Sequence, residues 1–153
     1  MPMFENVTKR IQSYSPRSLL LPEQAREAAV LMPLTRTGNP ELLLTLRAQN
    51  LSTHGGEVAF PGGRRDPEDQ DLIRTALRET HEEVGLAPDL VQVVGPLSQV
   101  ISRHGVKVTP YVGFIPEAVE YTANAGEIDS IFSVPLDFFA TDPRRNTHRI
   151  DYL

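Results

Sequence analysis

The chain of 153 residues is 40% hydrophobic and 23% charged, which excludes a disordered tail and a fibrous repeat and predicts a single folded domain. Its 15 Lys and Arg against 20 Asp and Glu leave a formal charge of −5, so we expect no nucleic-acid partner, and the absence of cysteine excludes disulfides and thiolate metal sites. The longest apolar run, residues 28–34, is too short to span a bilayer, and the N-terminus shows no secretory signal. We therefore expect a cytoplasmic protein with no membrane partner.

The first part of the chain predicts a short helix followed by a hairpin. Apolar residues recur at helical spacing near the N-terminus, at Phe4, Val7 and Ile11. Pro16 and Pro22 then predict an irregular arm, so residues 1–25 are interpreted as an N-terminal helix and arm. Apolar runs at 28–34 and 42–46 are separated by a Thr-Gly-Asn-Pro turn signal and predict two paired strands.

The remainder predicts one strong helix among several strands. The helical pattern covers residues 71–84 and ends before Gly85, a residue type that often caps a helix. Its apolar face is made of Ile73, Ala76, Leu77, Thr80 and Val84. Later elements are expected as strands at 90–94, 97–101, 106–115 and 127–134 and as a short helix at 135–139. Strands that outnumber the helices around one strong helix favour a layered α/β or α+β fold.

Three glutamates make the central helix acidic near its C-terminal end. Glu79, Glu82 and Glu83 fall within an arc of roughly 100°, which the spacing places opposite the apolar face. A solvated surface is the usual explanation, yet the helix dipole disfavours anions at this end by about 0.3–1 kcal/mol each. Arg78 can offset only part of this repulsion. A divalent cation would reverse it, and carboxylate ligands suit Mg²⁺ or Mn²⁺.

Upstream of the helix, the Phe-Pro-Gly-Gly segment at 60–63 predicts a sharp bend, and its glycines allow the backbone to approach a ligand. Together with the acidic helix, this segment resembles the Nudix hydrolases, whose box reads G-x5-E-x7-R-E-U-x-E-E-x-G-U, where U is bulky and apolar. The match runs from Gly63 to the sequence R-E-T-H-E-E-V-G-L at 78–86. The spacing is one residue longer than in the general box, Gln70 stands where the first Glu would fall, and Thr80 replaces the apolar U residue.

Residues 43–63 resemble a second signature, that of the coenzyme A pyrophosphatase branch of the Nudix family. The branch pattern L-L-T-x-R-[SA]-x3-R-x3-G-x3-F-P-G-G is matched from Leu43 through Arg47 to Gly63, and the branch shares the longer box spacing. Ser52 stands where the pattern has its second arginine, which removes a candidate phosphate contact.

The resemblance implies a fold and an activity. We expect residues 1–153 to form a single Nudix domain, an α/β/α sandwich with a mixed β-sheet. Family members usually continue with a further strand and helix beyond the position of Leu153, so the sandwich can lack that final pair, or the partner subunit of a homodimer can cover the open face. The implied reaction is metal-dependent hydrolysis of the pyrophosphate bond of coenzyme A or its derivatives, which gives 3′,5′-ADP and 4′-phosphopantetheine.

Two alternative functions stay open. The substrate can be another nucleoside diphosphate-linked molecule, such as ADP-ribose, a dinucleotide or a nucleoside triphosphate, and Ser52 is the residue that favours this alternative. The chain can also be a non-catalytic binding module with a Nudix fold. The three intact glutamates argue against that reading, because degenerate members of the family typically lose these carboxylates.

The resemblance also implies roles for individual residues. The metal ligands are the box carboxylates Glu79, Glu82 and Glu83. Glu82 is also expected to position the attacking water, and Arg78 is expected to orient the carboxylates, with a surface ion pair as its alternative role. Gly62 and Gly63 would offer backbone atoms to the metal or to the substrate.

Two further candidates come from outside the box. Arg47 is either a phosphate contact or an exposed arginine at the end of a strand. Glu127 is either an extra metal ligand or general base, as later loops of Nudix enzymes often provide, or a solvated loop residue. His54 and His104 could touch the substrate, but isolated histidines are more often structural, so no role is assigned to either.

Overall fold

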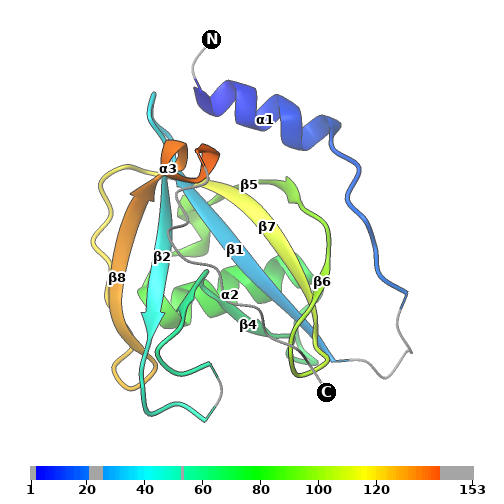
Figure 1. Ribbon diagram of the computed structural model, residues 1–153, viewed down its shortest axis with the longest axis vertical. Helices are drawn as coiled ribbons and strands as arrows, with labels where there is room; N and C mark the ends of the chain where they lie inside the picture. The colour runs from blue at the N-terminus through cyan, green and yellow to red at the C-terminus, as the bar shows by residue number, and fades with distance from the viewer. Residues whose placement is uncertain (1–2, 21–25, 53, 142–153) are drawn as a thin grey trace.

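The computed structural model describes residues 3–20, 26–52 and 54–141 (Figure 1). Pro22, in the predicted arm, lies outside these residues, and so does the chain beyond Thr141. The elements are α1 (Met3–Ser13), β1 (Glu27–Thr35), β2 (Glu41–Arg47), β3 (Val58–Ala59), β4 (Gly62–Arg64), α2 (Leu72–Val84), the 3₁₀ turn η1 (Pro88–Leu90), β5 (Gln92–Pro96), β6 (Val100–Ile101), β7 (Lys107–Ile115), β8 (Ile128–Pro135) and α3 (Leu136–Ala140).

The described strands form one mixed, eight-stranded sheet with β1 near its centre. β1 pairs in parallel with β7, from Glu27 opposite Lys107 to Thr35 opposite Ile115. It pairs antiparallel with β2 and β4, whereas β3 and β8 pair with β2, and β5 and β6 pair with β7. Both the predicted hairpin and the predicted mixed sheet are confirmed.

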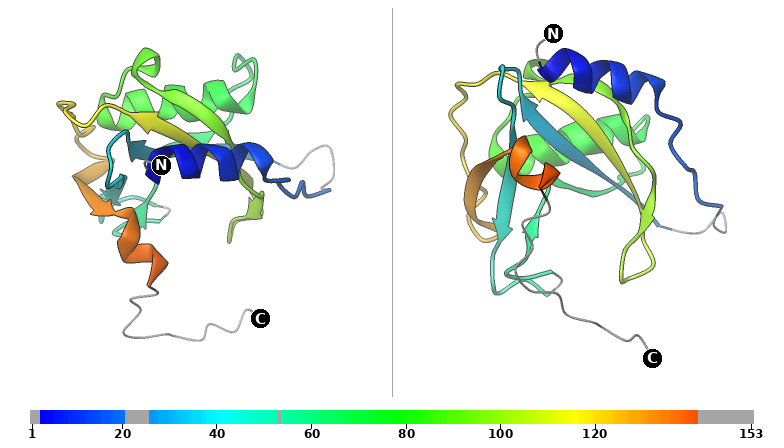
Figure 2. Two further views of the ribbon diagram at one scale, coloured as in Figure 1. Left: turned by 90° about the horizontal axis from the view of Figure 1, so that it is seen from above. Right: turned by 45° about the horizontal axis from the view of Figure 1, so that its top comes forward.

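Helices cover both faces of this sheet (Figure 2). Between α2 and the sheet lies a buried cluster of Ala29, Leu31, Leu43, Ala76, Val84, Leu86 and Ile115. On the opposite face, α1 packs Phe4, Val7 and Ile11 against a second cluster that includes Leu34 and Phe114. The fold is therefore the expected α/β/α sandwich. Among the described residues, none of the helices is both long and apolar enough to cross a membrane.

The predicted central helix is confirmed, and capping residues determine both of its ends. Asp71 precedes α2, and its side chain accepts a hydrogen bond from the backbone N–H of Arg74 at 2.8 Å. Gly85 follows α2 in the left-handed conformation, with φ 75°, and its N–H donates to the carbonyl of His81 at 3.0 Å. These caps define the two ends of the helix that carries the acidic residues.

The face of α2 that packs on the sheet differs from the prediction. Its buried residues are Thr75, Ala76, Thr80, Glu83 and Val84. Ile73 and Leu77 are only half-buried, and the acidic arc does not lie opposite the buried face, because Glu83 belongs to it with 4% of its surface exposed. The reason lies in β4, where Gly63 leaves room for the carboxylate of Glu79 and the N–H of Gly62 donates to the carboxylate of Glu83.

The sharp bend predicted over 60–63 is confined to Pro61, because the two glycines belong to strand β4. Val30 on β1 pairs with Gly62, and Ala29 pairs with Gly63. A Cβ at Gly62 would collide with the carbonyl oxygen of Ala29. Glycine is needed here for the close approach of two strands and not for a turn.

Two later strands also differ from the prediction. The strand expected at 90–94 begins at Gln92, because η1 occupies the preceding residues. The strand expected at 97–101 is reduced to β6. The other predicted elements agree with the structure to within one residue at each end, including the hairpin strands, β7, β8 and the short helix α3.

Candidate active site

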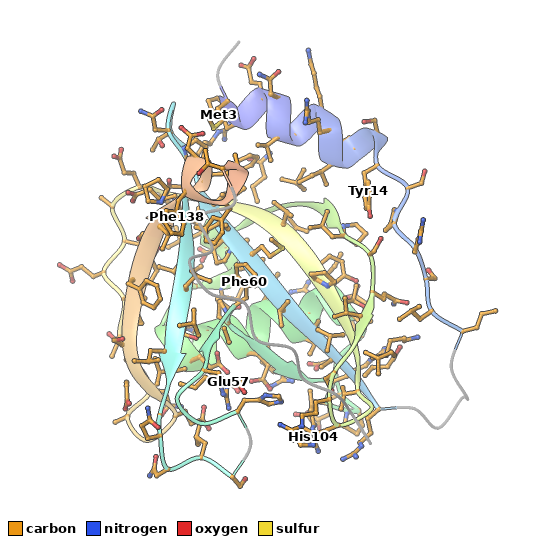
Figure 3. The ribbon with its side chains drawn as sticks, viewed as in Figure 1. Met3, Tyr14, Glu57, Phe60, His104 and Phe138 are labelled. Atoms are coloured by element: carbon orange, nitrogen blue, oxygen red, sulfur yellow. The ribbon has the colours of Figure 1, made fainter. Side chains whose placement is uncertain are left out.

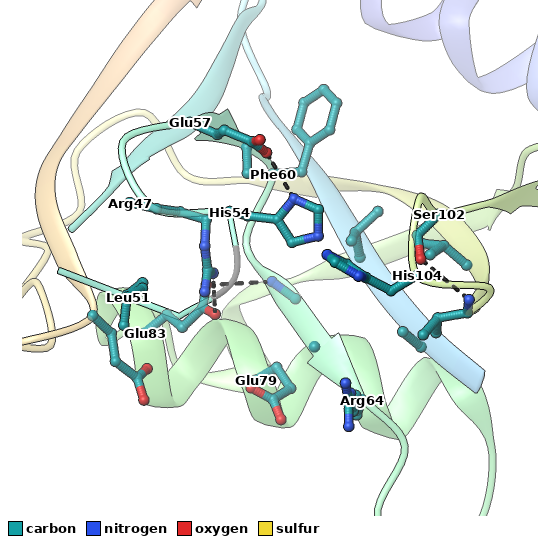
Figure 4. A pocket seen from close by; sticks show the side chains of 18 residues that line it. Arg47, Leu51, His54, Glu57, Phe60, Arg64, Glu79, Glu83, Ser102 and His104 are labelled. Carbon is teal, nitrogen blue, oxygen red and sulfur yellow. Dashed lines mark hydrogen bonds and ion pairs between the residues drawn. The ribbon is translucent and has the colours of Figure 1, made fainter. Parts of the chain in front are cut away.

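A cavity of about 510 Å³ opens where β2, β4 and α2 meet two loops (Figure 4). Most of the predicted site residues line it: Arg47, Gly62, Gly63, Glu79, Glu83 and Glu127. Val30 and Val108 add an apolar wall from β1 and β7. Figure 3 locates three further lining residues, Glu57, Phe60 and His104. The cavity therefore combines carboxylates with an apolar surface.

Glu83 is the most deeply buried acid of this cavity. Its Oε2 accepts a hydrogen bond from the backbone N–H of Gly62 at 3.4 Å, and Nη1 of Arg47 lies 3.8 Å from its Oε1. Burial outweighs these contacts and raises the pKa of Glu83 to about 7, and the charges of Glu79 and Glu127 act in the same direction. A cation placed beside Glu83 would favour its ionised form and lower this pKa.

Glu79 lies one turn earlier on α2, against the backbone of β4. Its side chain is 20% exposed, and Oε1 accepts a hydrogen bond from Nη1 of Arg78 at 3.0 Å. A Cβ at Gly63 would lie 2.5 Å from Cδ of Glu79, so glycine is the residue that leaves room for the carboxylate. Burial raises the pKa of Glu79 in spite of Arg78, and the charges of Glu82 and Glu127 add to the increase.

Glu82 and Glu127 contribute differently to the site. Glu82 is 55% exposed, does not line the cavity and contacts Nη1 of Arg78 at 3.4 Å. Glu127, just before β8, lines the cavity, and its charge acts on both Glu79 and Glu83. The structure thus brings Glu127 to the cavity together with two of the three helix glutamates.

Arg78 is held by an acid that the sequence interpretation missed. Its Nε and Nη2 donate to the two carboxylate oxygens of Asp69 at 3.0 and 2.9 Å, and Nη2 also donates to the carbonyl of Arg64 at 3.1 Å. The Asp69 side chain is 7% exposed and accepts further hydrogen bonds from the Asp66 N–H and the Thr75 hydroxyl. Hydrogen bonding to Arg78 holds the pKa of Asp69 far below its usual range, and the same bonds raise the pKa of Arg78.

A signal for Asp69 was present in the sequence. Counting forward from Gly63 with the spacing of the general box reaches Asp69, whereas counting back from Arg78 reaches Gln70. The extra residue therefore lies between Asp69 and Arg78. Sequence spacing alone does not tell on which side of the acid the insertion falls.

Arg47 lies at the end of β2 and faces the cavity with a side chain that is 23% exposed. Its Nε is buried and has no hydrogen-bond partner among the described residues. Its contact with Glu83, at 3.8 Å, is an ion pair but not a hydrogen bond. A guanidinium with unused donors beside a cavity is suited to an anionic group.

The carboxylate oxygens of this cavity are the type of ligand that a hard divalent cation prefers. Within residues 3–20, 26–52 and 54–141, no group of three or more His, Asp or Glu side chains is arranged to hold a metal ion. Glu79 and Glu83 nevertheless offer oxygen donors, and the pKa of each is raised first by burial and then by neighbouring carboxylates. A cation between them would favour the ionised form of both.

Comparison with known proteins gives matches over most of the chain. The NUDIX domain family model matches residues 25–150. An uncharacterized Nudix hydrolase NudL from Enterobacter sp. (strain 638) is 50% identical over 111 residues, which are 72% of this chain and 58% of that protein. NudL from Yersinia pestis (strain Pestoides F) is 48% identical, over 72% of this chain and 56% of its own length. The chain thus matches only a little more than half the length of these relatives.

Solved structures with low sequence identity share the fold. A binary complex of the C. elegans Ap4A hydrolase aligns with a TM-score of 0.62 at 19% identity, over 76% of this chain and 85% of that chain. The NUDIX domain of Shewanella oneidensis NrtR, complexed with ADP ribose, aligns with a TM-score of 0.60 at 16% identity, over 87% and 85%.

Proposed function

The chain belongs to the Nudix family, and on that premise we propose that it hydrolyses nucleoside diphosphate-linked substrates with the help of Mg²⁺ or Mn²⁺. We further propose that the substrate is coenzyme A or a derivative, cleaved at the pyrophosphate to 3′,5′-ADP and 4′-phosphopantetheine. One observation carries the proposal: Glu79, Glu83 and Glu127 line one cavity, where burial and neighbouring carboxylates raise the pKa of both helix glutamates.

The gathering of three acids in one cavity explains why a cation is needed. A diphosphate is itself anionic, so the three acids would repel it. When held by Glu79, Glu82 and Glu83, Mg²⁺ or Mn²⁺ would supply positive charge against the diphosphate and polarise water for attack. Glu82 is exposed, so it can exchange its long contact with Arg78 for a new partner at little cost.

The residues of the chain divide the remaining tasks. Glu127 lines the cavity and does not belong to α2. We propose that it acts as the general base that accepts a proton from the attacking water, and that Glu82 helps to position that water. Arg78, fixed by its ion pair, orients Glu79 and Glu82. Arg47 has unused donors beside the cavity and contacts a phosphate oxygen of the substrate.

Two observations support coenzyme A as the substrate. Arg47, Gly62 and Gly63 belong to the branch pattern over residues 43–63, and all three line the cavity. The apolar wall that includes Val30 and Val108 offers a surface for the uncharged part of a pantetheine arm.

A second candidate is a different nucleoside diphosphate-linked substrate. It is favoured by Ser52, which departs from the branch pattern. It is also compatible with the fold neighbours, which include an Ap4A hydrolase and a domain complexed with ADP ribose.

A substrate panel tests both candidates. The chain is incubated with coenzyme A, ADP-ribose, Ap4A or a nucleoside triphosphate, each with Mn²⁺ or Mg²⁺, and the products are identified by mass spectrometry. We expect coenzyme A to yield the two fragments named above. Consumption of another substrate alone would replace coenzyme A with that compound. If nothing is consumed although nucleotides bind, the chain is a binding module.

The panel has a matched pair of variants. Glu83→Gln keeps the shape of the side chain and removes the charge, and we expect it to lower turnover by orders of magnitude. Glu117→Gln makes the same change at an exposed position outside the cavity lining, and its turnover should equal that of the wild type.

A further inference from the structure

Two histidines from distant parts of the sequence meet at the cavity (Figure 4). His54 belongs to the connection between β2 and β3, and His104 belongs to the turn between β6 and β7. Their ring centroids are 5.2 Å apart, and the ring planes are nearly perpendicular at 78°. Neither histidine is used by the proposed reaction.

The ring of His54 is held in place by two features. Nδ1 lies 2.8 Å from Oε2 of Glu57, and because a carboxylate can only accept, Nδ1–H is the donor of this hydrogen bond. The backbone of His54 has φ 55°, in the left-handed region that disfavours residues with a side chain. Nε2 takes part in no hydrogen bond among the described residues, and in the protonated imidazole it carries an N–H that can be donated to an anionic ligand.

This wall of the cavity differs in charge from the wall formed by α2. The carboxylate of Glu57 already has His54 as its partner. Arg64 lines the same cavity and forms no ion pair with a carboxylate in the described part of the chain. An anionic group repelled by the glutamates of α2 therefore meets the guanidinium of Arg64 and two imidazoles here, and each imidazole donates from both ring nitrogens once it is protonated.

We propose that His54 and His104 bind a phosphate monoester of the substrate that lies outside the diphosphate bridge. The inference rests on the proposed function, because it assumes that the bridge occupies the carboxylate side of the cavity. It deepens that function by naming the feature of the substrate that is recognised. Coenzyme A carries such a phosphate at the 3′ position of its ribose, and ADP-ribose does not.

Binding of two nucleotides that differ by one phosphate tests the proposal without catalysis. The chain, freed of metal by a chelator, is titrated calorimetrically with 3′,5′-ADP and with 5′-AMP. We expect 3′,5′-ADP to bind about tenfold more tightly, the effect of a charge-assisted hydrogen bond. Equal affinities for the two nucleotides would overturn the proposal.

Paired variants show which ring nitrogen of His54 binds the phosphate. In His54→Asn, the amide can replace Nδ1 toward Glu57 and asparagine tolerates the left-handed backbone, but the Nε2 donor is lost. His54→Gln carries an amide that reaches toward the position of Nε2. We expect the preference for 3′,5′-ADP to fall several-fold in His54→Asn and in His104→Asn and to be kept in part by His54→Gln.

Arg103→Gln is the matched control, because Arg103 is exposed on the same turn as His104 and does not line the cavity. The preference should be unchanged in this variant. If instead the histidine variants lower the affinities for 5′-AMP and 3′,5′-ADP by the same factor, the histidines contact the base or ribose, and the proposal is wrong.

Hydrolysis of coenzyme A and 3′-dephospho-coenzyme A with Mn²⁺ separates the two proposals. A higher kcat/KM for coenzyme A that is lost in His104→Asn supports both. Failure to hydrolyse either compound, together with a retained preference for 3′,5′-ADP, contradicts the proposed function and leaves the phosphate site in place. If coenzyme A and 3′-dephospho-coenzyme A are hydrolysed equally well and the two nucleotides bind with equal affinity, the proposed function stands and the proposed phosphate site is wrong.

Discussion

Asp69 and Arg78 form an ion pair with two hydrogen bonds, at 3.0 and 2.9 Å, that ties the segment before α2 to the helix itself. The same guanidinium contacts the carboxylates of Glu79 and Glu82. Asp69 does not line the cavity, so its influence on the site passes through Arg78. The pair connects the fold of the loop to the placement of the acids.

Asp69→Asn should therefore reduce both stability and hydrolysis. Removing one partner of a largely buried pair is expected to lower the free energy of unfolding by about 1–3 kcal/mol, since Arg78 keeps some solvent contact. Loss of a group that orients ligand residues typically costs about 10- to 100-fold in activity. Urea unfolding and turnover at pH 7 measure the two effects. Asp66→Asn is the control, because Asp66 contacts the pair only through its backbone N–H.

The same ion pair predicts how the free energy of unfolding changes at acidic pH. The pKa of Asp69 is lower in the folded chain than in the unfolded one, so its contribution to stability is present above the usual Asp range and is lost as the pH falls below it. The free energy of unfolding should decline less between pH 5 and pH 2 in Asp69→Asn than in the wild type. Parallel declines in the two proteins would contradict the assignment.

Glu83 should have the opposite pH dependence. Its pKa is raised from 4.5 to about 7 in the folded chain, so the folded state keeps a proton that the unfolded state releases. Its contribution to stability is therefore full below about pH 4.5 and is lost as the pH rises through 7. Without added metal, Glu83→Gln should flatten the pH dependence over this interval and be more stable than the wild type at pH 8. A variant that is less stable at pH 8 would refute this account of Glu83.

Gly63→Ala should damage the site while the sheet persists. The new Cβ would lie 2.5 Å from Cδ of Glu79, so the carboxylate must move away from β4. We expect turnover to fall by at least about tenfold and the midpoint concentration of Mn²⁺ needed for activity to increase. Gly38→Ala is the matched control, because nothing lies within 4 Å of a Cβ there and its φ is not positive. Equal activity of the two variants would show that turnover does not depend on the position of the Glu79 carboxylate beside β4.

Divalent metal should stabilise the folded chain. Ligand that binds only the folded state at 100 times its Kd adds about 2.7 kcal/mol to the free energy of unfolding. The melting temperature should therefore rise with Mn²⁺ or Mg²⁺, and a chelator should reverse the rise. Combining Glu79→Gln with Glu83→Gln should abolish the shift, whereas Glu117→Gln should retain it. A melting temperature that stays flat across the titration speaks against a metal site in the folded chain.

Local signals in the sequence were enough to locate the secondary structure. Asp71 and Gly85 are capping residues that act within one turn of the helix, so the bounds of α2 could be predicted to within one residue. The two strands of the hairpin follow from apolar runs on either side of a turn. The spacing of Glu79, Glu82 and Glu83 predicted correctly that all three stand on one helix.

Contacts between distant segments could not be predicted in this way. Glu83 is buried where α2 meets β4 and accepts a hydrogen bond from the N–H of Gly62, a contact that periodicity does not reveal, so periodicity alone placed Glu83 on the wrong side of the helix. Asp69 was missed because a single inserted residue shifted the counting. The meeting of His54 and His104 depends on the pairing of β6 with β7 beside the β2–β3 connection, and neither segment carries a local sign of the other.

The two sides of the cavity are built on unequal supports. Glu79 and Glu83 stand on a helix that is capped at both ends and packed on the sheet, whereas His54 and His104 stand on connections between strands. Connections tolerate exchange far better than packed helices do. Under the proposed assignments, exchanging these two connections would change the substrate preference while Glu79 and Glu83 keep their places on α2.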